Sequence, residues 1–152
     1  KGARNLPFYP DTWDGYPWAR EKLYTLAASC GARDLVFLTG DSHSFWANRL
    51  ANDAGRPAGI EIGTAGISSP GDFMASGFGP ELSPRLDRAF ADHNDEIVWT
   101  DNMHQGYVRV ELRRGGGMAA FIAVDTVLSP HYRTRTIRRS GFAPRGGSVE
   151  FV

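Results

Sequence analysis

One nine-residue run constrains the fold of this chain more than any other feature. Residues 35–43 read LVFLTGDSH, with no charge before Asp41. Five apolar or β-branched residues in a row predict a central strand buried on both faces, as in a parallel sheet covered by helices. Gly40 allows a sharp turn directly after that strand, because glycine adopts positive φ without a steric cost. Ligands bind at the carboxyl ends of such strands, so we expect a site at this turn.

Asp41 and His43 lie two positions apart on the expected turn, where both side chains can point at one centre. A carboxylate oxygen and an imidazole nitrogen together suit a divalent or trivalent metal ion that supports hydrolysis. However, many strands end in Gly-Asp simply to form a turn, and a nearby histidine can hydrogen-bond that turn. The four residues alone therefore leave a metal site and a plain turn both open.

Several longer motifs flank this turn in a defined order. DTWDGYPWAR occupies residues 11–20, and SFWAN, GTAGISSPG, GYVRVEL and VDTV begin at residues 44, 63, 106 and 124. In order and spacing they resemble the carboxyl-terminal half of the PhoD-like alkaline phosphatase and phosphodiesterase family, a branch of the calcineurin-like metallophosphoesterases. The resemblance runs from about residue 10 to about residue 128. It favours the metal site over the plain turn.

The resemblance implies a fold and a domain organisation. The fold class is α/β, the carboxyl-terminal half of a metallophosphoesterase α/β/β/α sandwich with a mixed sheet. Residues 1–128 would form this half, and residues 129–152 an Arg-rich carboxyl-terminal extension. The partner would be the amino-terminal half of the same enzyme, since the early metal-binding motifs of the superfamily are not found here in a strand-end context. A periplasmic or secreted location also follows from the family.

The resemblance further implies an activity and a set of site residues. The activity is metal-dependent hydrolysis of phosphate mono- or diesters, which this chain alone would not catalyse. Asp41 and His43 match the late Gly-His-x-His ligands of the superfamily and would be the catalytic metal ligands. Family members point to Fe³⁺ and Ca²⁺, and an oxygen donor in place of a nitrogen suits such hard ions. The alternative is a non-catalytic binding or interaction module that has lost its metal site.

Other matched positions leave alternative roles open. Asp14 and Tyr16 would either support the site or fix the loop before the first helix, and Arg20 could pair with a nearby carboxylate. We expect His104 on the surface. Where family members often carry Asn-Pro-His, this chain has Asn-Asp-Glu at residues 94–96. If that histidine helps to position substrate, this protein binds its substrate differently.

Composition excludes some classes of function. The 152 residues carry 17 basic and 17 acidic side chains, so nothing predicts overall attraction to nucleic acid or acidic membranes. No apolar run approaches the roughly 20 residues needed to span a bilayer. Cys30, the single cysteine, cannot form an internal disulfide, and we expect a buried structural thiol on a helix.

The remaining elements follow from periodicity and turn residues. We expect helices over residues 17–30, 44–50 and 83–93 and strands over 59–63, 97–99, 107–112 and 118–124. Residues 1–10 and 73–80 read as irregular chain, and residues 113–117 as a hairpin turn. His93 suits a helix end better than a metal site. The arginines after residue 129 suit a solvated extension that returns across the domain, with a last edge strand near residues 149–152, better than a polyanion site.

Overall fold

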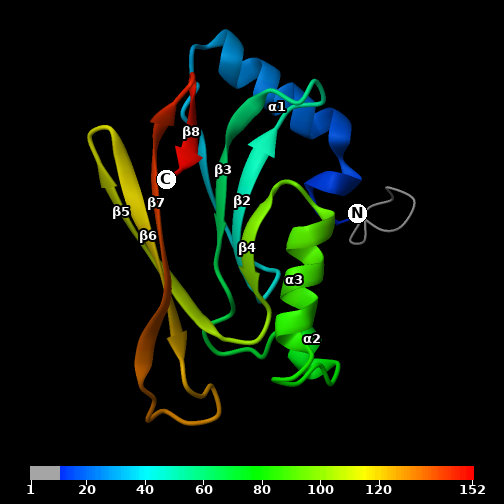
Figure 1. The fold of residues 1–152 in the computed structure, drawn as a ribbon, viewed down its shortest axis with the longest axis vertical. Helices are drawn as coiled ribbons and strands as arrows, with labels where there is room; N and C mark the ends of the chain where they lie inside the picture. Colours follow the sequence, from blue (N-terminus) through cyan, green and yellow to red (C-terminus); the bar gives the residue numbers. More distant parts are fainter. Residues whose placement is uncertain (1–10) are drawn as a thin grey trace.

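The computed structural model describes residues 11–152, so the expectation for residues 1–10 lies outside the described residues. The described chain forms two four-stranded sheets with helices beside one of them (Figure 1). In chain order the elements are a 3-10 turn η1 (Trp13–Gly15), α1 (Pro17–Ser29), β1 (Val36–Thr39), β2 (Phe45–Ala51), β3 (Pro57–Gly63), α2 (Asp72–Ala75), α3 (Ser83–His93), β4 (Ile97–Asp101), β5 (Gly106–Arg113), β6 (Gly116–Val124), β7 (Thr134–Arg145) and β8 (Ser148–Phe151).

Sheet 1 is mixed and has the order β1-β3-β2-β4. β1 and β3 are parallel, whereas β2 pairs antiparallel with both β3 and β4. The helix expected over residues 44–50 was wrong, because this segment is strand β2. Phe45 and Ala47 are fully buried while Trp46 and Asn48 are half-buried, which is the two-residue period of a strand.

Sheet 2 is an antiparallel meander in the order β5-β6-β7-β8. The hairpin expected around residues 113–117 is confirmed, since β5 and β6 pair from Gly106 opposite Ala123 to Arg113 opposite Gly116. The Arg-rich residues after 129 supply β7, which pairs along most of β6, and β8 forms the last edge strand. These residues are thus an integral part of sheet 2.

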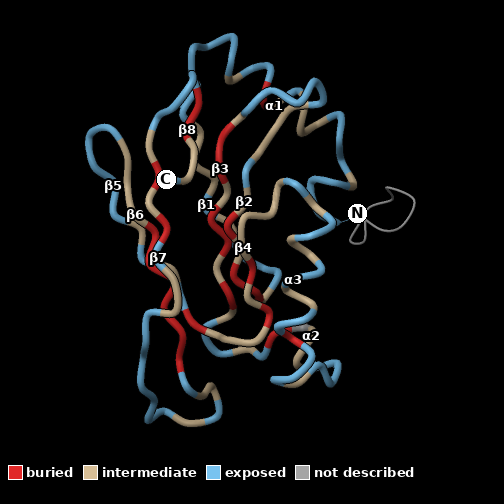
Figure 2. Tube along the Cα trace, in the orientation of Figure 1, coloured by how far each residue is buried: buried red, intermediate tan, exposed pale blue. Residues whose placement is uncertain are grey.

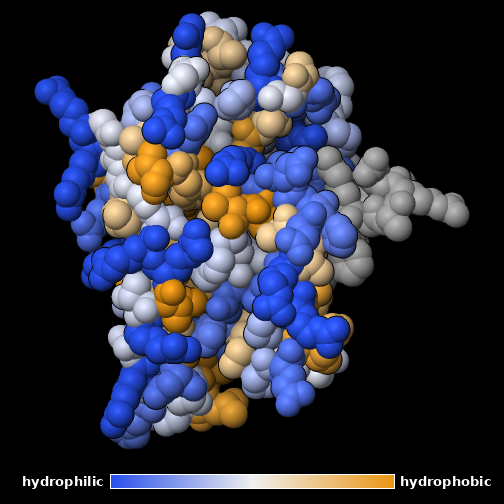
Figure 3. All heavy atoms as spheres, viewed as in Figure 1, coloured by the Kyte–Doolittle hydropathy of each residue, from blue (hydrophilic) through white to orange (hydrophobic). Residues whose placement is uncertain are grey.

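The two sheets pack face to face through aromatic side chains. Phe45 from sheet 1 meets Phe121 from sheet 2 edge-on at 5.8 Å between ring centroids. Trp99 lies 4.8 Å from Phe121 and is stacked on Phe45. The buried residues accordingly follow the facing strands of both sheets (Figure 2). Figure 3 shows scattered hydrophobic side chains separated by hydrophilic ones on the outer surface.

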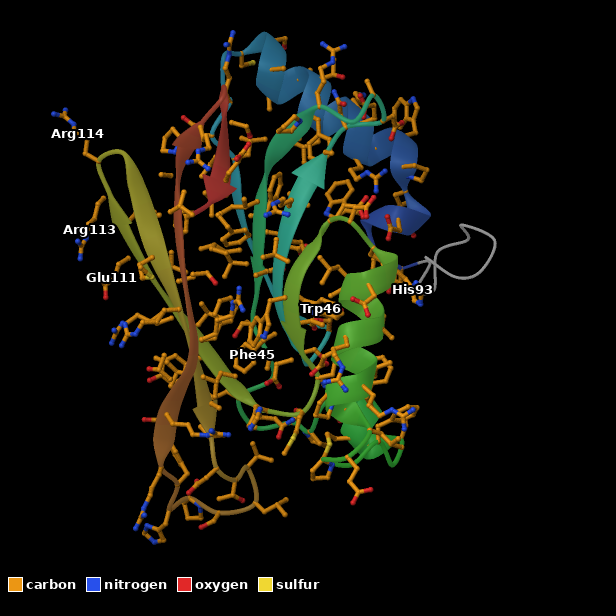
Figure 4. All side chains as sticks on the ribbon, in the orientation of Figure 1. Phe45, Trp46, His93, Glu111, Arg113 and Arg114 are labelled. Carbon is orange, nitrogen blue, oxygen red and sulfur yellow. The ribbon has the colours of Figure 1, made fainter. Side chains whose placement is uncertain are left out.

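The helices cover the other face of sheet 1. Phe45 points between the sheets, and the next residue, Trp46, points toward α3 (Figure 4), where it packs edge-on against Phe90 at 5.5 Å. α1 rests on the same face through Tyr24, whose ring meets Phe37 of β1. The helix expected over residues 17–30 is confirmed, but Cys30 is exposed and not buried, because Tyr24 supplies the packing face. Residues 73–80 are not wholly irregular, since α2 ends within them.

β1 differs from the expected central strand. Among the described residues it pairs with β3 alone and lies at the edge of sheet 1. Leu38 shares the inner face with Ile62, its register partner, yet Leu38 is 63% exposed. An uncharged run predicts that a strand will be covered, but it does not say which segment covers it. The α/β class and the mixed sheet are confirmed, whereas the central position of β1 was wrong.

We predict that the aromatic contact between the sheets dominates the stability of the fold. Phe121→Ala should lower the free energy of unfolding by about 3–5 kcal/mol, because it removes a fully buried ring and leaves a cavity. Urea unfolding monitored by tryptophan fluorescence measures this loss. The control is Leu128→Ala, at a side chain that is 94% exposed, which should change stability little. Equal losses in both variants would contradict this account of the core.

Candidate functional site

Three loops meet at one end of sheet 1, the lower end in Figure 1. They follow β1, β3 and β4, and they span residues 40–44, 64–71 and 102–105. Gly71 lies where the three approach most closely. A Cβ atom added there would stand 3.2 Å from the carbonyl oxygen of His43 and 3.3 Å from that of Asn102. The loop of residues 64–71 therefore bridges the other two.

Asp41 and His43 both adopt left-handed backbone conformations, with φ of 72° and 52°. They are the only non-glycine residues with positive φ among the described residues. This conformation costs L-residues about 1–2 kcal/mol each, and it persists only where the surroundings enforce it. Such strain concentrates at functional sites, so it singles out the two residues that the sequence identified as candidate ligands.

Neighbouring side chains enforce the strained loop. The indole N–H of Trp46 donates to Ser42 Oγ at 2.9 Å, and the Ser42 backbone N–H donates to the Gly40 carbonyl oxygen at 2.9 Å. His43 Nδ1 lies 3.2 Å from the carbonyl oxygen of Pro70, so this nitrogen carries the proton. When the imidazole is neutral, its other ring nitrogen, Nε2, carries the lone pair that a metal ligand requires.

The loop after β4 carries a second polar cluster that sequence reasoning missed. Asp101 Oδ2 lies 2.9 Å from His104 Nδ1, and His104 Nε2 lies 2.7 Å from Arg135 Nη2. His104, expected on the surface, is partly exposed, with 21% of its side chain accessible. The one available sequence signal was the three-residue spacing of Asp101 and His104. Arg135 is 31 residues further along the chain and gives no such signal.

Burial and hydrogen bonding act in opposite directions on the pKa values of the two aspartates in this region. Burial raises the pKa of the Asp101 carboxyl, but hydrogen bonds from the His104 side chain and from the backbone N–H groups of His104 and Met103 outweigh burial. The pKa of Asp101 therefore lies below its ordinary value. At Asp87 burial dominates and raises the pKa, although Asn102 donates to its carboxylate through both backbone and side-chain N–H groups.

The remaining candidate residues lie elsewhere. Asp14 accepts a hydrogen bond from Arg20 Nη1 at 2.9 Å, as expected for Arg20, and Tyr16 is 57% exposed at the start of α1. Their proposed support of the site stays a prediction. His93 lies at the end of α3 that is remote from the three loops (Figure 4). Asn94 ends that helix by donating to the Phe90 carbonyl oxygen at 2.8 Å.

Within residues 11–152 no three histidine, cysteine, aspartate or glutamate side chains group in a way that could hold a metal ion. Asp41 and His43 therefore supply two donors of compatible chemistry but not a full ligand set. None of the helices described is long and apolar enough to cross a membrane.

Comparison with known proteins identifies the family. The model of the PhoD-like phosphatase family matches residues 1–121, and the chain belongs to this family. Alkaline phosphatase D of Bacillus subtilis (strain 168) is 28% identical over 109 residues, which are 71% of this chain and 18% of that protein. A solved structure titled "Structure of PhoD" has the same fold, with a TM-score of 0.68 and 22% identity over 93% of this chain and 26% of the other. This chain thus spans about a fifth to a quarter of the length of these proteins.

We predict that the strain at Asp41 is measurable as a difference between two substitutions. Asp41→Gly should be more stable than Asp41→Ala by about 1 kcal/mol, because glycine accepts a φ of 72° and alanine does not. Urea unfolding midpoints give the comparison. Asp34, which is exposed and does not have positive φ, is the matched control. At this position Asp34→Gly should not be more stable than Asp34→Ala. The same order at both positions would disprove strain at Asp41.

We also predict a specific acid dependence of stability. Because the pKa of Asp101 is lower in the folded than in the unfolded chain, its contribution is complete above the unfolded value of about 3.9 and is lost as pH falls through the lower, folded value. Asp101→Asn should remove this part of the acid destabilisation. Unfolding midpoints measured from pH 6 down to about pH 2 test it. Asp87→Asn should not reduce the loss of stability at low pH, because the pKa of Asp87 is raised in the folded chain and not lowered.

Proposed function

We propose that this chain is part of a metal-dependent phosphoesterase that hydrolyses phosphate mono- or diesters, with Asp41 and His43 as its metal ligands. The observation that carries the proposal is the strained turn after β1. Two residues of metal-binding type are held there in left-handed conformations at the carboxyl end of a parallel strand. Membership of the PhoD-like phosphatase family supports the same class of reaction.

The chemistry of the two donors supports a metal at this turn. The Asp41 side chain is exposed, so its carboxylate is accessible to a hard cation such as Ca²⁺ or Fe³⁺. The contact of His43 Nδ1 with the Pro70 carbonyl is the arrangement that orients metal-binding histidines in other proteins. A bound metal ion would supply Lewis acidity to the phosphoryl group. Asp41 and His43 would hold and orient it, and the loop of residues 64–71 would keep the imidazole in place.

The rest of the site would come from a longer protein. This chain spans 18% of alkaline phosphatase D, and two donors cannot complete a binuclear centre. In the longer protein, a further strand would pair with the open edge of β1 and cover Leu38, which is otherwise an exposed apolar side chain on an edge strand. The further ligands would then approach Asp41 from that side.

Substitutions in the full-length protein test this function. Asp41→Ala and His43→Ala should each remove most of the hydrolysis of an activated phosphoester and lower the metal content, because each loses a ligand. Tyr16→Ala should cost less, roughly 10–100-fold, as expected for a group that acts through others. The 152-residue chain alone should show no turnover. Initial rates and metal analysis of each purified variant give the comparison.

His93→Ala is the matched control, since it removes a histidine at the remote end of α3 and should leave both rate and metal content unchanged. Wild-type rates and metal content in Asp41→Ala and His43→Ala would show that residues 40–43 are only a turn. A full-length protein without metal and without turnover would instead support a binding module.

A further inference from the structure

The cluster of Asp101, His104 and Arg135 has a defined hydrogen-bond direction. A guanidinium group only donates, so His104 Nε2, which lies 2.7 Å from Arg135 Nη2, must accept and carry no proton. The proton of the neutral imidazole is then on Nδ1, which donates to the Asp101 carboxylate at 2.9 Å. Asp101 thereby fixes the tautomer of His104, and His104 fixes the position of Arg135.

Arg135 lies at the same end of the molecule as Asp41 and His43. It is opposite Ala123 in the β6–β7 ladder, and Ala123 is opposite Gly106 in the β5–β6 ladder. Two strand spacings amount to about 10 Å. The Arg135 side chain spans this separation, since its Nη2 atom lies 2.7 Å from Nε2 of His104, two residues before Gly106. The Gly106 N–H donates to the Gly66 carbonyl oxygen, and a Cβ atom added at Gly66 would lie 3.6 Å from the His43 ring. A continuous path through neighbouring residues therefore joins Arg135 to the candidate ligand His43.

The charge of Arg135 is not cancelled by a direct ion pair with Asp101, because the neutral imidazole separates the two groups. Arg135 is exposed, and its bond to His104 uses one of five N–H donors. An open hollow of about 590 Å³ lies over the turn between β6 and β7, lined by Asp125, Pro130, His131, Tyr132 and Arg133. Arg135 does not line this hollow, but its own exposure makes its guanidinium accessible to a ligand. A guanidinium fork matches the oxygens of a phosphate group.

We propose that Arg135 is a binding residue for a phosphoester oxygen, and that Asp101 and His104 are positioning residues for it. This inference rests on the proposed function, because it assigns part of the substrate recognition of the same site. Arg135 holds the substrate oxyanion from the sheet 2 side, while Asp41 and His43 act from the sheet 1 side. The Arg-rich carboxyl-terminal segment thereby contributes to substrate binding through a single side chain of β7.

Phosphate binding to the metal-free full-length protein tests the role of Arg135. In isothermal titration calorimetry with inorganic phosphate, Arg135→Gln should weaken binding by roughly tenfold or more, since it removes a charge-assisted hydrogen bond, and Arg135→Lys should weaken it less. The control is Arg139→Gln, an exposed arginine on the same strand that lies opposite Ala120. Undetectable binding by the wild-type protein, or equal binding by Arg135→Gln, would overturn the proposal.

A second variant tests the positioning role without touching the ligand. In Asp101→Asn the amide oxygen at the Oδ1 position still accepts from the backbone N–H groups of Met103 and His104, and it lies 3.1 Å from His104 Nδ1. The amide nitrogen takes the nearer position, 2.9 Å from Nδ1, and we expect it to donate to that nitrogen. The proton of His104 then moves to Nε2. There it points at the N–H of Arg135, and the hydrogen bond between the two side chains is lost. Phosphate binding should fall to the level of Arg135→Gln, and ¹⁵N NMR should show the change of tautomer. A changed tautomer with wild-type phosphate binding would overturn the positioning role.

Kinetics of the metal-loaded protein separate substrate binding from product binding. Arg135→Gln should raise KM for p-nitrophenyl phosphate by roughly tenfold with a smaller change in kcat, and it should weaken inhibition by inorganic phosphate similarly. An unchanged KM with weaker phosphate inhibition would contradict a role in substrate binding. Failure of the proposed function appears separately, as absence of turnover in the wild-type protein, whereas the metal-free titration requires no activity.

Discussion

The face-to-face packing of the two sheets is the constraint on which the rest of this structure depends. Phe45 begins β2 directly after the strained turn, and its fully buried ring contacts both Trp99 and Phe121. Fixing Phe45 also fixes the residues on either side of it, because side chains alternate between the faces of a strand. Trp46 is thus directed to the α3 side, from which its indole N–H reaches back to Ser42. The core contact and the geometry of the turn are therefore coupled.

The same packing brings distant segments of the chain to one end of the molecule. Trp99 and Asp101 lie two residues apart on β4 and point to the same face. Trp99 enters the core, where the Arg138 guanidinium lies 5.1 Å from its ring centroid, while Asp101 holds His104 at the rim. Arg138 and Arg135 come from β7, so the cluster requires both sheets. Burial lowers the pKa of Arg138, because desolvation disfavours the charged guanidinium.

Local sequence signals predicted the elements whose determinants are local. α1 and α3 both begin with a proline in the first turn, and the hairpin between β5 and β6 is joined by a short arginine- and glycine-rich turn. The turn after β1 was identified from only four residues. Its left-handed conformations were not predicted, because they depend on Trp46, on the Pro70 carbonyl and on close approach at Gly71.

The errors share one physical origin, which is that long-range pairing overrides local preference. In residues 44–50 the adjacent apolar residues Phe45 and Trp46 hide the two-residue period, because one faces sheet 2 and the other faces α3. Cys30 was expected to be buried because it belongs to an apparently apolar stripe of the helix. The side chain that contacts β1 is instead Tyr24. The partner of His104 is likewise set by the pairing of β7 with β6. Such partners cannot be deduced from a single sequence.

In the proposed site, the two sheets would contribute contacts of two different kinds. On sheet 1, backbone strain directs Asp41 and His43 to one turn, where a carboxylate and an imidazole offer hard and intermediate donors to a cation. At the rim of sheet 1, the half-buried Asp101 of β4 holds the neutral His104, and His104 contacts Arg135 of sheet 2, whose guanidinium can donate to an anion. A phosphoester requires both kinds of contact, since its oxygens must be held while its phosphorus is activated. The loop of residues 64–71 contacts His43 on one side and Gly106, two residues after His104, on the other, so it lies between the two parts of the proposed site.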